Sequence, residues 1–456
     1  MQHSGRDIRR AACRLARDRR GNFAVVFGAV AAVLTVAVGF GVDTMQLFNA
    51  KSALRATLDS AVTSTARDLT TGTIRPEDAD EAVSAFIRAN SAGGVLPHDK
   101  IVLENLTVDP GARTVTATAH VDVELFFPLF GMERTRRVSE TNSAVYSDKK
   151  IEVAMMLDLT SSMEKDVRRG TDKIGDLRDA AEIAVESFLG LNNPANPRVR
   201  IALVPYSDGV NAGPLAHVVF REAADSTGKA DAPPPLTAAR PVSAGGSACA
   251  TERKNATGNA MDFSDAGPGT AMVNLDDRLK SCPDSALVPL TSNKAGLIDA
   301  IRGFKANGYT AGHIGIQWTR YLLSPKWRST LEAAVSGSGP AEYSDRKAKK
   351  IAVLMTDGLF NTAFAGVPRN EQTRNAQAKR SRAAALAHCE RMKADKIEVF
   401  TVGFMLDDPD AKAIMRDCAS DDYGSIRHYY LAADGDALKA AFREIAANAE
   451  KLVLTR

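Results

Sequence analysis

The pattern of apolar and polar positions changes twice along this chain of 456 residues, and the first pattern is an apolar run near the N-terminus. From Phe23 to Val42 the chain carries no charge, and Thr35 is its one polar side chain. These 20 residues are enough for a helix to span a bilayer. We expect a retained anchor rather than a cleaved signal, because the stretch is long and is followed by Asp43 and a helical pattern.

Beyond Asp43 the spacing of apolar residues indicates an amphipathic helix that continues as a stalk to about residue 70. Its apolar stripe consists of Leu47, Leu54, Leu58, Ala61, Val62 and Leu69. A second helix is predicted from Pro76 to Asn90, before the loop Ser91-Ala92-Gly93-Gly94. Two strands follow, Ile101 to Val108 and a strictly alternating one after the turn at residues 109–112. The apolar face of the alternating strand consists of Val115, Ala117, Ala119, Val121, Val123 and Leu125.

From residue 151 the pattern becomes one of short buried strands separated by amphipathic helices, which predicts a mostly parallel sheet covered on both faces. The predicted strands are Ile151–Leu157, Val199–Tyr206, Ile351–Thr356, Glu398–Phe404 and His428–Leu431. The predicted helices are residues 173–190, 294–306, 311–323, 371–394 and 434–450. Residues 207–290 interrupt this alternation and are rich in Gly, Pro, Ser and Ala, so we expect a long surface insertion there.

The net charge of +3 is distributed unevenly. Residues 1–22 carry seven arginines against two aspartates, a local charge of +5, so the remainder is about +3 − 5 = −2. That balance argues against nucleic acid as a partner of the main body of the chain. A basic segment just before an apolar span predicts a cytoplasmic N-terminus, with the bulk of the chain on the other side of the membrane.

The cysteines agree with this topology. Cys13 lies on the predicted cytoplasmic side, and four others lie on the exported side, where disulfides persist. Those four are Cys249, Cys282, Cys389 and Cys418. Three pairings are open, and proximity in sequence favours Cys249–Cys282 with Cys389–Cys418; four unpaired buried thiols are the alternative.

Oxygen-bearing side chains follow two of the predicted strands and precede one predicted helix. Asp158, Thr160 and Ser162 come directly after the first strand, and Asp357 comes directly after the strand Ile351–Thr356. Thr310 lies on a glycine-containing loop before a helix. Because ligands of open α/β sheets bind at the carboxyl ends of the strands, these side chains are expected to converge there. Two carboxylates and three hydroxyls suit a hard cation, Mg²⁺ or otherwise Mn²⁺ or Ca²⁺.

This combination resembles the metal-ion-dependent adhesion site (MIDAS) of von Willebrand factor type A domains, with Thr160 in place of the first serine of the Asp-x-Ser-x-Ser loop. The resemblance implies a Rossmann-like α/β fold over residues 149–456 and a metal that binds an acidic group of a protein partner. The alternative is that the two aspartates merely cap helices. A phosphotransferase resembling the haloacid dehalogenase class is a further alternative, although position 160 is Thr where most of that class have a second acid.

Other candidate residues are interpreted as structural. His313 lies three residues after Thr310 and is expected to be a structural histidine at a helix start. Asp407-Asp408-Pro409-Asp410 is typical of a solvated turn and helix cap, and Trp318 and Trp327 are expected in the core.

The order of the parts carries a second resemblance. The segments Arg20–Phe27, Gly41-Val42-Asp43, Ala311–Trp318 and Leu323-Ser324-Pro325 are similar to TadG-like proteins of tight-adherence (Flp) pilus systems, as are Thr401–Phe404 and Cys418-Ala419-Ser420. The resemblance implies a non-enzymatic protein of the bacterial inner membrane that supports assembly or anchoring of pili, with pilus assembly proteins as partners. An adhesin or chaperone of another envelope system is the alternative. The expected organisation is a cytoplasmic tail (1–22), a transmembrane helix (23–42), a stalk with a small α+β module (43–148) and a largely periplasmic von Willebrand factor A-like domain (149–456).

Overall fold

The computed structural model describes most of the chain and divides it into two compact units, Met1–Ser147 and Asp148–Arg456, each of which is described by itself. The described residues are 22–90, 100–127, 133–147, 149–168, 170–190, 192–193, 197–221, 240–241, 248–255, 260–268, 273–345, 347–367 and 374–455. The arginines of the predicted cytoplasmic tail, Cys13 and the loop at residues 91–94 lie outside them.

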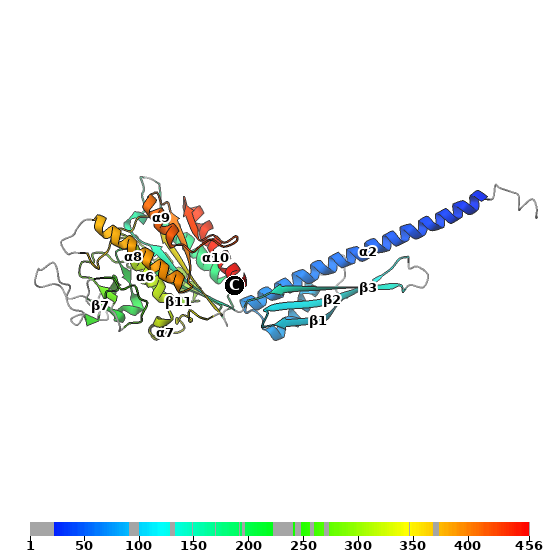
Figure 1. Ribbon diagram of the computed structural model, residues 1–456, viewed down its shortest axis with the longest axis horizontal. Coiled ribbons are helices and arrows are strands. Elements are labelled where there is room, and N and C mark those ends of the chain that lie inside the picture. Colours follow the sequence, from blue (N-terminus) through cyan, green and yellow to red (C-terminus); the bar gives the residue numbers. More distant parts are fainter. Residues whose placement is uncertain are drawn as a thin grey trace, which may run out of the picture. The chain divides into compact units, whose positions relative to one another are not determined.

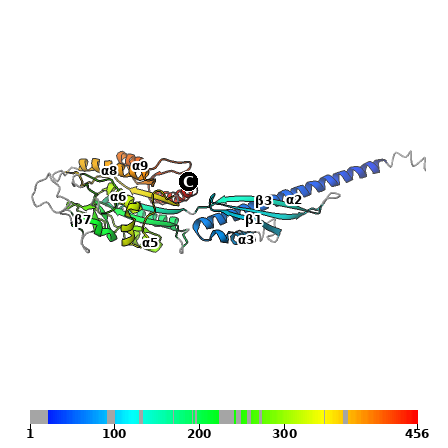
Figure 2. The same cartoon turned by 60° about the horizontal axis from the view of Figure 1, so that its bottom comes forward.

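The first unit is organised around one long helix, α2 (Asn22–Thr71). Its C-terminal part packs on a three-stranded antiparallel sheet in the order β1 (Ile101–Asp109), β2 (Thr114–Glu124) and β3 (Thr135–Val145). Figures 1 and 2 show α2 running along the strands and continuing beyond them towards its N-terminus. Helix α3 (Ala79–Asn90), which follows a 3₁₀ turn at Pro76–Asp78, lies beside the C-terminal part of α2 (Figure 2).

The core of this unit lies between α2 and the sheet. Leu54, Leu58, Ala61 and Val62 of the predicted stripe are at most 1% exposed. They pack against the alternating apolar face of β2, on which the side chains from Val115 to Val123 are buried. The predicted stripe and strand face are therefore confirmed. Strand β3 was not predicted, because its sequence is mostly polar and its side chains are at most partly buried.

The second unit contains a doubly wound sheet. Its strands are β4 (Lys150–Asp158), β5 (Val199–Tyr206), β11 (Val288–Thr291), β12 (Ala348–Thr356), β13 (Glu398–Phe404) and β14 (Tyr429–Ala432). They lie in the order β11-β5-β4-β12-β13-β14, with β11 antiparallel and the other five parallel. Numbered along the chain this is the order 3-2-1-4-5-6 of doubly wound α/β folds. The predicted α/β fold class is confirmed.

Helices cover both faces of this sheet, as the continuous apolar strands require. Side chains of β4 alternate between two cores: Val153 and Met155 face α4 (Lys173–Leu189), α5 (Lys294–Arg302) and α10 (Gly435–Thr455). Ala154 and Met156 face α6 (Gly312–Leu323), α8 (Arg374–Ala394) and α9 (Pro409–Cys418). Trp318 and Trp327 are fully buried in the second core, as expected. Strand β11 and helices α7 (Arg328–Ala334) and α9 were not predicted, although the helix cap before α9 was.

The predicted surface insertion at residues 207–290 is partly a core element instead. Residues 249–254 are buried, and Cys249–Ala250 forms strand β9 beside β6 (Val210–Asn211). The backbone N–H of Arg253 donates to Gln317 Oε1 of α6 at 2.9 Å, and Lys254 pairs with Asp276 at 2.9 Å. The expectation of a surface loop was wrong here because composition does not reveal that the charged side chains are paired inside the protein.

Candidate functional site

Two carboxylates meet at the C-terminal edge of the parallel sheet. Asp158 is the last residue of β4, and Asp357 directly follows β12, which pairs with β4. Oδ2 of Asp158 accepts a hydrogen bond from Thr356 Oγ1 at 2.7 Å and a longer one from the Asp357 N–H at 3.4 Å. Parallel pairing therefore places two carboxylates that are far apart in sequence side by side, as predicted from their positions after two strands.

The loop after β4 joins the two carboxylates through hydroxyl groups. The Thr160 N–H donates to Asp158 Oδ1 at 2.9 Å, which holds the loop close to the strand end. Thr160 Oγ1 lies 2.8 Å from Ser162 Oγ, and that serine donates to Asp357 Oδ1 at 2.6 Å. Four of the five predicted metal ligands thus form one hydrogen-bonded group.

Thr310 is held next to this group by its own loop. The N–H of Asn307 donates to the Leu159 carbonyl at 2.7 Å, and the N–H of Ser161 donates to the Gly308 carbonyl at 2.9 Å. Gly308 has a φ of +88°, which a residue with a side chain rarely adopts, so the glycine allows this turn. Thr310 is itself buried, and its N–H donates to Asn361 Oδ1 at 3.1 Å. It therefore lies between the loops that follow β4 and β12.

The site is electrostatically unfavourable for two ionised acids. Asp158 is completely buried, and burial together with the nearby charge of Asp357 raises the pKa of Asp158 from 3.8 to about 6, although hydrogen bonds from Thr160 and Thr356 oppose this rise. The Tyr206 hydroxyl donates to Asp158 Oδ2 at 2.7 Å. Burial and the Asp158 charge raise the pKa of Tyr206 well above 10, so it remains a donor. A cation that neutralises the carboxylates would relieve this cost, and the oxygen-only donor set fits Mg²⁺ or a similar hard cation.

A lysine side chain already places a positive charge beside one of the two carboxylates. Nζ of Lys173 lies 2.8 Å from Asp357 Oδ2, and its side chain is only 20% exposed. Lys173 is the first residue of α4, directly after Asp172, whose side chain caps the helix by accepting from the Gly175 N–H. A positive charge at a helix N-terminus is unfavourable unless a carboxylate balances it. A lysine at the first position of a predicted helix is therefore the sequence signal that could have revealed Lys173, which was not among the predicted site residues.

The remaining candidate residues have structural roles. Nε2 of His313 lies 3.0 Å from Glu252 Oε1 and Nδ1 lies 2.8 Å from Ser381 Oγ, in a buried cluster of its own. Asp408 caps α9 by accepting from the Ala411 N–H, as the predicted helix cap requires. Within the described ranges, no group of three or more His, Cys, Asp or Glu side chains is arranged to hold a metal. Hydroxyl groups would have to complete any metal site here.

Both favoured disulfides are present. Cys249 is bonded to Cys282 with a Cα–Cα distance of 6.2 Å, and Cys389 to Cys418 with a distance of 5.1 Å. The first attaches the buried strand β9 to the segment before β11, and the second attaches α8 to α9. The predicted pairing is confirmed, and it is typical of proteins that fold in an oxidising compartment.

The N-terminal helix carries the family signal. Among the described residues, one helix, Val25–Thr71, is long and apolar enough to cross a membrane. Residues 21–68 match the Flp pilus-assembly TadE/G-like family. This segment is TadE/G-like. The matched TadE/G-like segment contains the apolar stretch and most of the stalk that packs on the small sheet. No curated protein matches the chain.

Solved structures of pilus proteins show distant similarity. The chain is 15% identical to the pilus adhesin SpaC from Lactobacillus rhamnosus GG, with 77% of this chain and 35% of SpaC covered and a TM-score of 0.36. It is 13% identical to the vWF domain of the type V pili tip protein Mfa5 from Porphyromonas gingivalis (68% and 97% covered, TM-score 0.38). It is 12% identical to the PilB minor pilin from Streptococcus sanguinis (77% and 79% covered, TM-score 0.37). The chain thus spans about a third of the length of SpaC.

Proposed function

We propose that this protein is a membrane-anchored envelope protein that supports assembly or anchoring of Flp pili by binding a protein partner through a divalent cation. The TadE/G-like segment supports the pilus context, and its apolar run supports a single-pass anchor. The two disulfides support a location of the second unit outside the cytoplasm, in the periplasm. The positions of the arginines before residue 22 support a cytoplasmic N-terminus at the inner membrane.

The proposal of metal binding rests on one observation: a hydrogen-bonded group of side chains joins the loops after β4 and β12 around the buried carboxylate of Asp158. Asp158, Thr160, Ser162 and Asp357 are linked by contacts of 2.6–2.9 Å, and Thr310 lies on the adjoining loop. Helix capping does not account for this arrangement, because the donors to Asp158 are the Thr160 N–H and the hydroxyls of Tyr206 and Thr356, none of which is an N–H of the first turn of a helix. In this proposal these five residues hold Mg²⁺ or a similar cation.

The chemistry of the site favours binding over catalysis. Two carboxylates balance the charge of one divalent cation, and the hydroxyls add ligands without adding charge. The cation would therefore retain affinity for one more oxygen ligand, which an acidic side chain of a partner protein can supply. A phosphotransferase would need a second acid near Asp158, but position 160 carries a threonine whose hydroxyl contacts Ser162. We therefore expect no enzymatic turnover.

Calorimetry of the full chain in lipid nanodiscs with Mg²⁺ and with Mn²⁺ tests the cation. Binding heat in the wild type and none in Asp158→Ala is the expected result, whereas identical titrations would overturn the metal site. Crosslinking and pulldown in cells that make Flp pili then test the partner. A pilus assembly protein captured by the wild type and lost in Asp158→Ala supports the proposal. Capture of only proteins unrelated to pili contradicts the pilus role, and phosphatase activity that is lost in Asp158→Ala contradicts the absence of catalysis.

A further inference from the structure

The segment that follows strand β2 is hydrogen-bonded to helix α2 at one residue, Asp43. Asp43 is the first charged residue after the apolar stretch Phe23–Val42, and it is only 6% exposed. Its carboxylate accepts from the Phe126 N–H at 2.8 Å and from the Phe127 N–H at 3.0 Å. A carboxylate that accepts two backbone N–H groups forms strong, charge-assisted hydrogen bonds. They hold the chain just beyond β2 beside the point where the apolar stretch ends.

The two phenylalanines at this attachment are exposed. Phe126 is 70% exposed and Phe127 is 50% exposed, although each is a large apolar side chain. A Cβ atom at Gly39 would lie 2.7 Å from Cγ of Phe127, so the Phe127 ring lies directly against the helix inside the apolar stretch. Phe40 of that helix is itself 60% exposed. The rings and the helix therefore form one apolar surface at the level of residues 39–43.

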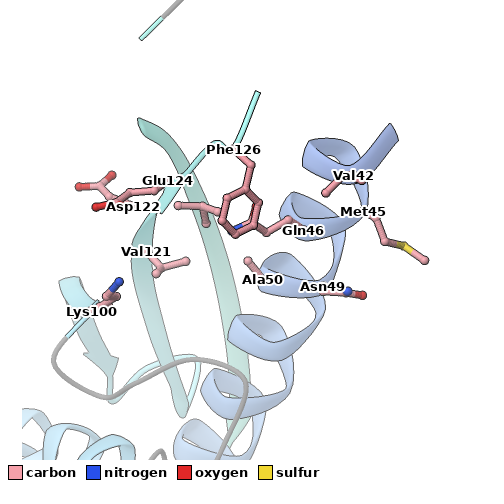
Figure 3. Close-up of a pocket in the computed structure, with 11 residues that line it drawn as sticks. Val42, Met45, Gln46, Asn49, Ala50, Lys100, Val121, Asp122, Glu124 and Phe126 are labelled. Atoms are coloured by element: carbon pink, nitrogen blue, oxygen red, sulfur yellow. The ribbon is translucent and has the colours of Figure 1, made fainter. Parts of the chain in front are cut away.

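A cavity of about 650 Å³ lies between α2 and β2 at this level. Figure 3 shows Phe126 and Val42 towards one end of it, and Lys100 and Asn49 towards the other. Ala50, Val121 and Val123 contribute apolar walls along its length. The lining contains one basic side chain, Lys100, and two carboxylates, Asp122 and Glu124, so its polar part carries no net positive charge. The lining is thus mixed, with apolar side chains of α2 and β2 beside the polar side chains of Gln46, Asn49, Asp122 and Glu124.

We infer that Phe126 and Phe127 make a second contact with the membrane, in which their rings lie in the bilayer interface beside the spanning helix. The inference rests on the proposed membrane anchoring by α2. The occupant is the bilayer because the exposed rings continue the surface of the apolar stretch, and large apolar side chains such as Phe insert at the boundary between lipid head groups and acyl chains. Since the cavity lining carries one lysine against two carboxylates, the contact does not depend on anionic lipids. Asp43 acts as a positioning residue that fixes the small sheet against the membrane surface.

Fluorescence quenching by lipids tests this contact. The full chain with Cys13→Ser and Phe126→Cys is labelled with an environment-sensitive fluorophore and reconstituted into phosphatidylcholine vesicles that contain a lipid with a shallow nitroxide group. The matched control is Val145→Cys, because Val145 is also exposed (56%) but pairs with Thr114 at the opposite end of β2. Quenching at position 126 is expected to exceed quenching at position 145 by about twofold or more, and to be equal with and without phosphatidylglycerol.

Vesicle flotation separates failure of this inference from failure of the proposed function. A chain that does not float with the vesicles overturns the membrane anchor, whereas a floating chain with equally weak quenching at positions 126 and 145 overturns the second contact alone. A label at position 126 that is shielded from water but not quenched by the lipid, to a degree that varies with the ratio of protein to lipid, would show that a second copy of the chain covers this position. That result also overturns the second membrane contact. Adding Asp43→Ala to Phe126→Cys should keep flotation and lower the quenching; unchanged quenching contradicts the positioning role.

Discussion

Nζ of Lys173 lies 2.8 Å from Oδ2 of Asp357, so one of the two carboxylates of the candidate site already has a cation beside it. Among the described residues, the other carboxylate, Asp158, accepts hydrogen bonds from Thr160, Tyr206, Thr356 and the Asp357 backbone, all of them uncharged donors. A divalent cation bound between the two acids would compete with the lysine for Asp357. Metal affinity at this site is therefore expected to depend on how easily Lys173 moves away.

Replacement of Lys173 by methionine should strengthen Mg²⁺ binding. Methionine keeps an apolar stem of similar length but removes the ammonium, which at about 4 Å repels each unit of positive charge by roughly 4 kcal/mol at an effective dielectric of 20. Movement of the lysine relieves part of that repulsion, so we expect a gain in affinity of about tenfold or more by calorimetry. Lys165→Met is the matched control, because Lys165 is 64% exposed and pairs with Asp172 instead. Equal gains in both variants would show that general charge, and not competition at Asp357, sets the affinity.

Replacement of Asp158 by asparagine should stabilise the metal-free protein. The folded-state pKa of Asp158 is raised from 3.8 to about 6, so stability of the metal-free fold is lost as the pH rises through this window. At neutral pH and above, the neutral amide avoids that loss, and we expect a gain of about 1–3 kcal/mol in urea unfolding with a chelator present. Excess Mg²⁺ should then stabilise the wild type but leave Asp158→Asn unchanged. Stabilisation of both proteins by Mg²⁺ would place the metal elsewhere.

Replacement of Asp265 by asparagine should have the opposite effect on stability. Burial opposes ionisation of Asp265, but hydrogen bonds from Lys326 and Ser324 and the charge of Arg320 lower its pKa from 3.8 to about 2. Its stabilising contribution is thus fully present above pH 3.8 and is lost as the pH falls towards 2. We expect Asp265→Asn to cost about 1–2 kcal/mol at pH 6 and less at pH 3, as measured by urea unfolding. A cost that stays constant with pH would assign the effect to packing.

Loss of the Cys389–Cys418 disulfide should destabilise the second unit. The bond joins residues 29 positions apart and attaches α8 to α9, so its removal increases the conformational freedom of the unfolded chain. We expect the double variant Cys389→Ala/Cys418→Ala to lose about 2–4 kcal/mol of unfolding free energy. Reduction by dithiothreitol should lower the melting temperature of the wild type by more than that of the variant, which keeps only Cys249–Cys282. Equal effects of the reductant would show that the second disulfide does not contribute.

Some of the site was accessible from the sequence because parallel strands obey a simple geometric rule. Asp158 and Asp357 each end an apolar run, and the carboxyl ends of parallel strands share one edge of the sheet. The hydroxyls of Thr160 and Ser162 lie within a few residues of Asp158, so local spacing was enough to bring them to the same place. Thr310 is brought there by backbone contacts of its loop with the loop after β4.

Other features depend on contacts that no local pattern reports. Strand β3 is mostly polar; β2 supplies its backbone hydrogen-bond partners, and only Val138 and Ala144 of its side chains pack on the core of this unit. The buried segment at residues 249–254 contains Glu252, Arg253 and Lys254, and such charges are found inside a protein only when partners from distant segments neutralise them. Composition indicated a surface loop because the side chains that contact these charges, Asp276 beside Lys254 and His313 beside Glu252, are separated from the segment in sequence.

Local patterns in the sequence were enough to predict most of the elements, the long apolar helix, the pairing of cysteines by proximity and the oxygen-bearing residues at the strand ends. These properties follow from the period of the apolar pattern and from short spacings along the chain. The three-dimensional contacts alone revealed which charged side chain faces those oxygens and which residues lie beside the end of the apolar stretch. Lys173 with Asp357, and Asp43 with the N–H groups of Phe126 and Phe127, are contacts between distant segments. Their strength depends on burial and distance, which exist only once the chain has folded.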